Sequence, residues 1–237
     1  MKKTILSLLL VTVFAVAGLS QKTINDPNAE VREAKNFRAI ELSSAFDVYL
    51  TQSNEESVAV SASEKKYREN IKVEVKGGVL IVGYDNKGKW NSGNKKLKAY
   101  ISFKQLDKLN VSGACDVYIV DAWKAENLKL DMSGASNLKG KIDAQKLMID
   151  LSGASDLTLN GDVGQLNIEA SGASDFKGFD MIVDYCNAKA SGASDIKITV
   201  NKELSAEASG ASDVKYKGAG LIRDIKTSGA SSISRRS

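Results

Sequence analysis

Apolar and polar residues alternate along the second half of the chain, on both sides of a recurring Ser-Gly-Ala tripeptide. The first and third residues before each tripeptide are mostly apolar, as Leu151 and Ile149 are before Ser152. The fifth residue after the Ser is also apolar, as Leu157 is, and mostly polar residues separate these positions. A period of two residues is typical of strands with one buried face. The pattern therefore predicts strands on both sides of each tripeptide, and no helical period fits these repeats.

The tripeptide recurs seven times, at steps of 21, 19, 19, 20, 18 and 19 residues. One such unit cannot bury its apolar face alone, but stacked units can, with equivalent positions above one another. The sequence therefore predicts an all-β fold, a right-handed parallel β-helix (solenoid) over residues 109–237 with seven Ser-Gly-Ala corners. Each coil would contain a strand, a tight corner, a second strand and a looser return. The right-handed sense follows from the twist of the strands.

The Gly of the tripeptide is the predicted structural residue of each corner. It calls for a positive φ angle or for an approach too close for a Cβ atom. The seven corner glycines are Gly113, Gly134, Gly153, Gly172, Gly192, Gly210 and Gly229. A serine follows the Ala in six copies, and these hydroxyls are expected to form a ladder that caps corner backbone groups. Such a row of hydroxyls could also bind a polysaccharide, and capping is the simpler interpretation.

The first residues, 1–20, have the pattern of a secretory signal peptide. Lys2 and Lys3 precede a mostly apolar run that is too short for a membrane span, and small residues follow it. We expect an exported mature chain without a transmembrane segment, in the periplasm, on the outer surface or outside the cell. Losing the two lysines lowers the formal net charge of +4 by two, so the chain has no charge footprint for nucleic acid.

Residues 21–108 precede the regular repeats. Residues 21–35 contain the only proline and are predicted to be a flexible leader. Residues 36–108 are predicted to form a less regular β module that caps the solenoid. Within it, residues 39–50 resemble the first repeat, so they form either a degenerate coil or a capping strand pair. Gly77 and Gly78 lie between two apolar runs and indicate a hairpin.

One polar, basic loop is the first candidate binding site. It spans residues 86–96 and carries Trp90 beside Lys89, Asn91 and Lys95. An exposed aromatic ring among amide and amino groups could stack on a sugar ring or on a partner surface. The alternative is a long hairpin loop with Trp90 folded back on a strand.

A column of acidic residues is the second candidate. Stacking would bring Asp156, Asp175, Asp195 and Asp213 above one another, and like charges at this spacing repel. Oxygen ligands suit Ca²⁺, which makes this column a weak calcium candidate. The alternative is that each Asp accepts hydrogen bonds from the corner or pairs with the Lys two residues later, as at Lys177.

Little in the composition supports catalysis. The sequence has no His, which removes the commonest general base and the commonest metal ligand. Its acids are spread evenly rather than gathered on one face, so we expect no enzyme and no cofactor. Of the two cysteines, Cys186 occupies an inward position and Cys115 replaces a ladder serine. They lie more than three coils apart, so they are predicted not to form a disulfide.

These features together resemble a known family. The signal peptide, the degenerate segment with Phe46-Asp47-Val48-Tyr49 and the stacked corners are similar to the auto-transporter adhesin "head GIN domain" proteins of Gram-negative bacteria. The resemblance covers about residues 36–234. It implies a right-handed β-helix shaped like the pectin lyases but without their catalytic residues, and a role in cell adhesion.

The sequence therefore predicts an adhesin-like β-solenoid of the cell surface or envelope, without catalytic activity. Its expected partner is a glycan or a surface protein of a host or neighbouring cell, and a homo-oligomer is a further expectation. The alternative is a structural scaffold of the periplasm or envelope with no dedicated ligand. An enzyme acting on polysaccharide is a minor alternative.

Overall fold

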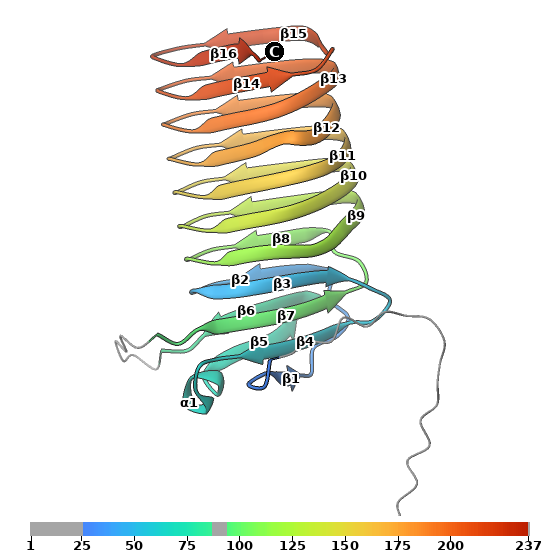
Figure 1. Cartoon of the computed structure of the whole chain (residues 1–237), viewed down its shortest axis with the longest axis vertical. Helices are drawn as coiled ribbons and strands as arrows, with labels where there is room; N and C mark the ends of the chain where they lie inside the picture. The colour runs from blue at the N-terminus through green and yellow to red at the C-terminus, as the bar shows by residue number, and fades with distance from the viewer. Residues whose placement is uncertain (1–25, 87–93, 237) are drawn as a thin grey trace, which may run out of the picture.

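The computed structural model describes residues 26–86 and 94–236 of the chain. It is an all-β solenoid of parallel stacked coils, with the N-terminal module at one end and the last coil at the other (Figure 1). The predicted fold class is confirmed. The predicted signal peptide, 1–20, lies outside the described residues. Among the described residues, no helix has the length and apolar character of a membrane span.

Sixteen strands and one short helix make up the described chain. The first group of elements is β1 (Glu30–Arg32), β2 (Ala39–Leu42), β3 (Phe46–Gln52), β4 (Ser57–Ser61), α1 (Lys65–Arg68), β5 (Ile71–Lys76), β6 (Val79–Tyr84), β7 (Leu97–Phe103) and β8 (Lys108–Val111). The repeats then supply β9 (Asp116–Met132), β10 (Asn137–Leu151), β11 (Asp156–Ala170), β12 (Asp175–Ala190), β13 (Asp195–Ala208), β14 (Asp213–Lys217), β15 (Leu221–Thr227) and β16 (Ser232–Arg235).

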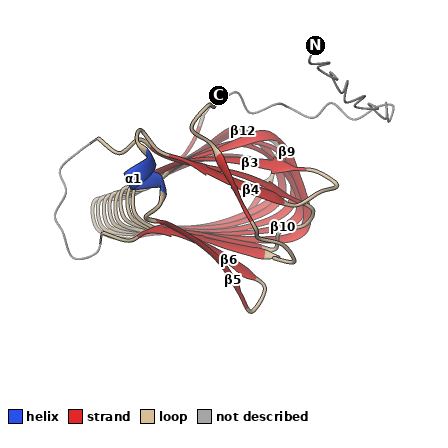
Figure 2. Ribbon diagram, turned by 90° about the horizontal axis from the view of Figure 1, so that it is seen from below, coloured by secondary structure: helices blue, strands red, loops and turns tan. Residues whose placement is uncertain are grey.

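Strands β9 to β13 each run from one corner to the next. Each leaves a corner along one side of the coil, bends at the far edge and comes back along the other side (Figure 2). Neighbouring strands in this set pair in parallel. The predicted looser return is a bend within one continuous strand, and the pairing register shifts at the bends between several of these coils.

The interior of the solenoid is filled by the predicted inward positions. In the coil around Ser152, Ile149, Leu151 and Leu157 are all buried, and their equivalents in the coils below and above are buried as well. The pairing register places these equivalents directly over one another, as Leu138, Leu157 and Phe176 show. Period-two alternation therefore becomes continuous apolar columns along the axis.

The seven corner glycines form a column at the opposite edge from the bends. All have φ between 72° and 85°. A Cβ atom on any of them would lie between 2.2 and 2.8 Å from a backbone oxygen of the coil below, which is too close. Both physical reasons expected for Gly therefore hold at once. The Ala after each Gly donates its N–H to the corner oxygen below, at 2.7 or 2.8 Å.

The corner serines are buried and bonded as predicted. The hydroxyl of Ser194 donates to the carbonyl oxygens of Ser191 in its own corner, at 2.9 Å, and Ala170 in the coil below, at 3.0 Å. Ser212 makes the equivalent pair of bonds. The hydroxyls of Ser136, Ser194, Ser212 and Ser231 thus each tie a corner to the coil beneath it. Cys115 takes the same place in the first regular corner and is buried.

The degenerate segment is a true coil of the solenoid. Strands β2 and β3 pair in parallel with β8 and β9, the first regular coil. Ser44 occupies the corner Gly position with a φ of 81°. Below this coil, β6 and β7 pair in parallel with β2 and β3 and add one more layer. The order in space therefore differs from the order along the chain.

Antiparallel strands close this end of the solenoid. Strands β5 and β6 form the hairpin predicted at Gly77 and Gly78, β4 pairs with β7, and β1 pairs with β4. The last of these is a correction, because residues 30–32 were expected to belong to a flexible leader. The antiparallel strands cover the lowest coil, as expected of a cap.

Candidate functional site

Most of the candidate loop site lies outside the residues that the structure describes. Trp90, Lys89 and Asn91 fall in residues 87–93, outside the described residues. Lys95 is described, and its Nζ lies 5.2 Å from the centroid of the Tyr84 ring. The loop joins β6 to β7, and these strands pair in parallel with β2 and β3, which flank the Ser44 corner. Its role in binding stays a prediction.

The acidic column is interleaved with lysines. Lys177 Nζ lies 2.7 Å from a carboxylate oxygen of Asp156 and 3.7 Å from one of Asp175. Lys197 and Lys215 lie 4.0 and 2.9 Å from Asp195 and Asp213 in the same way. The expected pairing of each Asp with the Lys two residues later is therefore present for these three carboxylates.

Protonation in this column follows from these contacts. A hydrogen bond from the Ser232 hydroxyl, then one from Lys215, lowers the pKa of Asp213 below its ordinary value. The hydrogen bond with Asp156 raises the pKa of Lys177, so this lysine stays charged. Within the described residues, no group of three or more His, Cys, Asp or Glu side chains could hold a metal ion. The calcium site at Asp156, Asp175, Asp195 and Asp213 remains a prediction.

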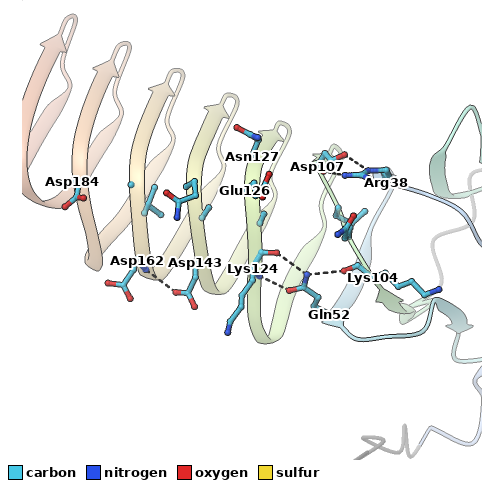
Figure 3. A pocket seen from close by; sticks show the side chains of 17 residues that line it. Arg38, Gln52, Lys104, Asp107, Lys124, Glu126, Asn127, Asp143, Asp162 and Asp184 are labelled. Atoms are coloured by element: carbon cyan, nitrogen blue, oxygen red, sulfur yellow. Dashed lines mark hydrogen bonds and ion pairs between the residues drawn. The ribbon is translucent and has the colours of Figure 1, made fainter.

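A groove runs along the bent edge of the solenoid, opposite the corners, and we call it the return groove. One part of it has a volume of about 990 Å³ and lies over the bends of β9 to β12 and the module below them (Figure 3). A second hollow of about 520 Å³ shares Gln145, Gly164 and Asp184 with the first, so the two are continuous. The polar side chains that line the first part include Gln52, Asn127, Asp143, Gln145, Asp162 and Asp184.

Carboxylates from successive coils line this groove. Asp143, Asp162 and Asp184 lie on three neighbouring bends (Figure 3). Asp143 accepts the N–H of Asp162 at 3.2 Å and lies 3.6 Å from Lys141 Nζ. Asp184 lies 2.8 Å from Lys202 Nζ. The acids are thus distributed along the axis, and Asp143 and Asp184 each have a lysine partner.

Gln52 closes the groove at the N-terminal module. Its Nε2 donates to the carbonyl oxygens of Lys104 and Lys124 at 3.1 and 3.0 Å, and its Oε1 accepts the N–H of Lys124 at 2.8 Å (Figure 3). Nearby, Arg38 donates two hydrogen bonds to Asp107, at 2.7 and 2.9 Å. The Arg38 guanidinium lowers the pKa of the Asp107 carboxyl. These bonds fix the backbone where the irregular module meets the regular coils.

The second part of the groove offers an aromatic ring among amides. Tyr185 is 46% exposed, and Gln165, Asn167 and Asn187 line the same hollow. Lys202 Nζ lies 5.4 Å from the centroid of the Tyr185 ring. An exposed ring beside amides and carboxylates can contact the apolar face of a sugar and hydrogen-bond its hydroxyl groups.

The sequence reasoning did not find this groove. The feature of the sequence that could have indicated the groove is the unequal spacing of the Ser-Gly-Ala repeats. Four residues separate consecutive strands at every corner from β9 to β14, whereas β9 to β13 vary from 14 to 17 residues. Extra residues therefore go to the bends, where the pairing register shifts. The structure does not bring Lys95 to this groove, which has other lining residues.

Both cysteines are buried and free. Burial raises the pKa of Cys186 to about 12, and burial also raises the pKa of Cys115. A thiol with a raised pKa is a poor nucleophile at neutral pH. Both positions therefore act as packing residues, as the repeat phase predicted for Cys186.

Known structures share this fold. A putative adhesin from Bacteroides fragilis superposes with a TM-score of 0.83 at 23% identity, covering 88% of this chain and 96% of that one. A putative adhesin from Parabacteroides merdae gives 0.70 at 16%, covering 88% and 95%. A protein named as a putative lipid binding protein from Parabacteroides distasonis gives 0.67 at 20%, covering 90% and 98%. At these identities the likeness establishes the fold alone.

Sequence comparison gives the family. No curated protein matches the chain. The family model described as "Putative auto-transporter adhesin, head GIN domain" matches residues 36–220, which is most of the chain and includes the degenerate coil and the regular coils as far as β14. The chain therefore belongs to the auto-transporter adhesin head GIN domain family.

Proposed function

We propose that this protein is an exported, non-catalytic, adhesin-like protein that binds a glycan along the return groove. The observation that carries the proposal is the continuous groove with exposed Tyr185, lined by amides and carboxylates. Amide and carboxylate groups fix the orientation of a sugar through its hydroxyls, while an aromatic ring covers its apolar face. A row of polar side chains on stacked coils suits an extended ligand that spans several coils.

The arrangement of acids supports binding rather than hydrolysis. Glycosidases place two carboxyl groups on either side of one scissile bond. Here Asp143, Asp162 and Asp184 lie one per coil along the axis, and two of them have a lysine partner. The sequence also lacks His. These features favour a binding surface without a reacting centre.

Binding at Tyr185 can be tested with a matched tyrosine outside the groove. Tyr118 is 38% exposed and stacks on Tyr49, with the ring centroids 5.4 Å apart. A glycan array on the mature chain identifies the ligand, and titration calorimetry then compares Tyr185→Ala with Tyr118→Ala. Stacking of an aromatic ring on a nucleobase contributes about 1–3 kcal/mol, and a similar contribution on a sugar would give about a 5- to 150-fold loss of affinity for the first variant. We expect no change for the second. Equal loss in both variants, or no bound glycan, contradicts the proposal.

Surface display separates an adhesin from a scaffold. Protease treatment of intact cells should cleave an adhesin that faces outward, with a periplasmic enzyme as the control for intact envelopes. A protein that is cleaved only after the outer membrane is opened, and that binds no glycan, matches the scaffold interpretation instead. Trp90→Ala in the same array tests the loop predicted from the sequence.

A further inference from the structure

Within residues 94–236, the coil of β15 and β16 has no further strand layer over its apolar columns. Strand β15 pairs in parallel with β13, and β16 with β14, and no other described strand pairs with either. Ile222 stacks on buried Leu204, and Ile225 stacks on buried Ala206, so both continue inward columns. They are nevertheless 42% and 40% exposed. The exposure therefore results from the uncovered end of the core and not from an outward orientation.

The opposite end is closed. There β1, β4 and α1 cover the lowest coil, and Phe37, Tyr67 and Ala34 are buried (Figure 1). Unpaired strand edges promote pairing with another chain. A molecule with one open end forms a closed pair when that end binds its own copy, whereas two open ends would give a filament. The asymmetry of this solenoid therefore favours a two-fold contact.

Strand β15 has a pattern that complements itself. A shift in the pairing register after Ile222 places Arg223 and Asp224 between the two inward isoleucines. The run from Ile222 to Ile225 thus reads inward, outward, outward, inward. When such a strand pairs antiparallel with its own copy about the centre of this run, Ile222 faces Ile225 and Arg223 faces Asp224. Opposite charges and apolar pairs directly across antiparallel strands are both favourable.

We propose that a second copy of this chain docks on this end, with β15 pairing antiparallel to β15 of the second copy. Each Ile222 then contacts Ile225 of the other copy, and the two core columns become continuous. Arg223 and Asp224 now pair with Glu203 and Lys226, at 2.7 Å in both cases. These exposed side chains lie beside the contact. In the dimer, each Arg223 would also pair with Asp224 of the second copy. The inference does not depend on the proposed glycan site.

Sedimentation velocity of the mature chain, from about 1 to 100 µM, tests the contact. We expect twice the monomer mass for the wild type and the monomer mass for Ile225→Arg, because the arginine would enter the joined core. Val31→Arg is the matched control, since Val31 is an apolar residue of β1 at the closed end and is 76% exposed. It should leave the dimer unchanged. Circular dichroism melts establish that each variant is folded.

Charge reversal identifies the register. Arg223→Asp alone and Asp224→Arg alone should each weaken the dimer at least tenfold, because like charges then face one another. The double variant should restore it, although Glu203 then lacks its Arg223 partner within the coil. A monomeric wild type at 100 µM, or a dimer that Ile225→Arg leaves intact, overturns the proposal. So does a monomer that binds phosphatidylcholine vesicles through this end, because the occupant would then be lipid.

Discussion

The two edges of each coil, the corner edge and the return edge, solve the same problem in different ways. Both must reverse the chain and pass it to the other side of the coil. At the corner, four residues of almost constant sequence make the turn, and each corner Gly lies against the one below. At the return, long strands bend with shifts in register, and the side chains vary from coil to coil.

This difference separates structural constraint from freedom to bind. At the seven regular corners, backbone contacts leave no room for a side chain at the Gly position, so this residue does not vary among them. At the return, Gln145, Gly164 and Asp184 occupy neighbouring places in the same groove although they differ in size and charge. A ligand can be recognised only where side chains can differ. The most repetitive part of the sequence therefore builds the fold, and the least repetitive part supplies the groove.

The largest loss of stability is expected when a methyl group is added to a corner glycine. Gly172→Ala would place its Cβ 2.5 Å from the carbonyl oxygen of Gly153 while keeping a φ of 74°. Overpacking and left-handed strain together should lower the free energy of unfolding by about 3 kcal/mol or more. Urea denaturation of the mature chain measures this change.

Gly78→Ala is the control that isolates strain from contact. Gly78 has a φ of 77°, yet a Cβ there would meet nothing within 4 Å. Its expected cost is about 1–2 kcal/mol, from the left-handed conformation alone. If both variants lose the same stability, close packing is not what constrains the corner, and the contrast between the two edges fails.

The corner edge was predictable because its chemistry is local and repeated. Gly172 combines a positive φ with close contact to the carbonyl oxygen of Gly153 in the coil below, and only Gly suits both conditions. Seven identical tripeptides therefore encode one corner geometry. The return groove was not predictable, since it arises where strands of unequal length are forced into one register. No residue type marks it. Tyr185 lies in the repeat phase of Asn127, Lys146 and Gln165, and of these three only Gln165 lines the same hollow as Tyr185.

The N-terminal module shows a second limit. Its strands were predicted individually, and so was the hairpin at Gly77 and Gly78. The insertion of β2 and β3 between the layers of β6–β7 and β8–β9 was not predicted. Pairing between segments distant in sequence depends on which apolar faces remain uncovered after the coils form. Periodicity within a segment carries no information on that choice.

A smaller loss of stability is expected when a corner hydroxyl group is removed. Ser194 is fully buried and donates to the carbonyl oxygens of Ser191 and Ala170. Ser194→Ala should lower the free energy of unfolding by about 1 kcal/mol, the usual net contribution of such a bond. Ser191→Ala, at a less buried position of the same corner, is the control and should change it less. Equal effects at both positions would contradict a capping ladder.

An ion pair beside the return groove should contribute less. Arg38 hydrogen-bonds Asp107 and lowers the pKa of that carboxyl, and both side chains are more than half exposed. Because the folded pKa lies below the ordinary value of 3.8, the stabilisation is present above about pH 4 and is lost as pH falls below it. Because both side chains are exposed, solvent screening keeps this stabilisation small.

Comparing Asp107→Asn with the wild type by urea denaturation at several pH values measures this contribution. The variant should be slightly less stable at pH 7, and the difference should disappear as the pH falls below the lowered pKa of Asp107. A difference that persists at low pH would mean that packing at this position, and not the carboxylate charge, stabilises the junction.

The smallest effect concerns the Asp column at the corner edge. If lysines neutralise this column, EDTA should leave the melting temperature unchanged, and added Ca²⁺ should not raise it. Lys177→Gln removes the cation that lies 2.7 Å from Asp156 and 3.7 Å from Asp175. Its expected cost is about 0.5 kcal/mol, falling with added salt because exposed charges are screened.

A column that needs a metal behaves oppositely: EDTA lowers the melting temperature, and Lys177→Gln strengthens Ca²⁺ binding because it removes a competing cation. Calorimetric melts of both proteins, with EDTA and with Ca²⁺, distinguish a lattice of paired charges from a metal site.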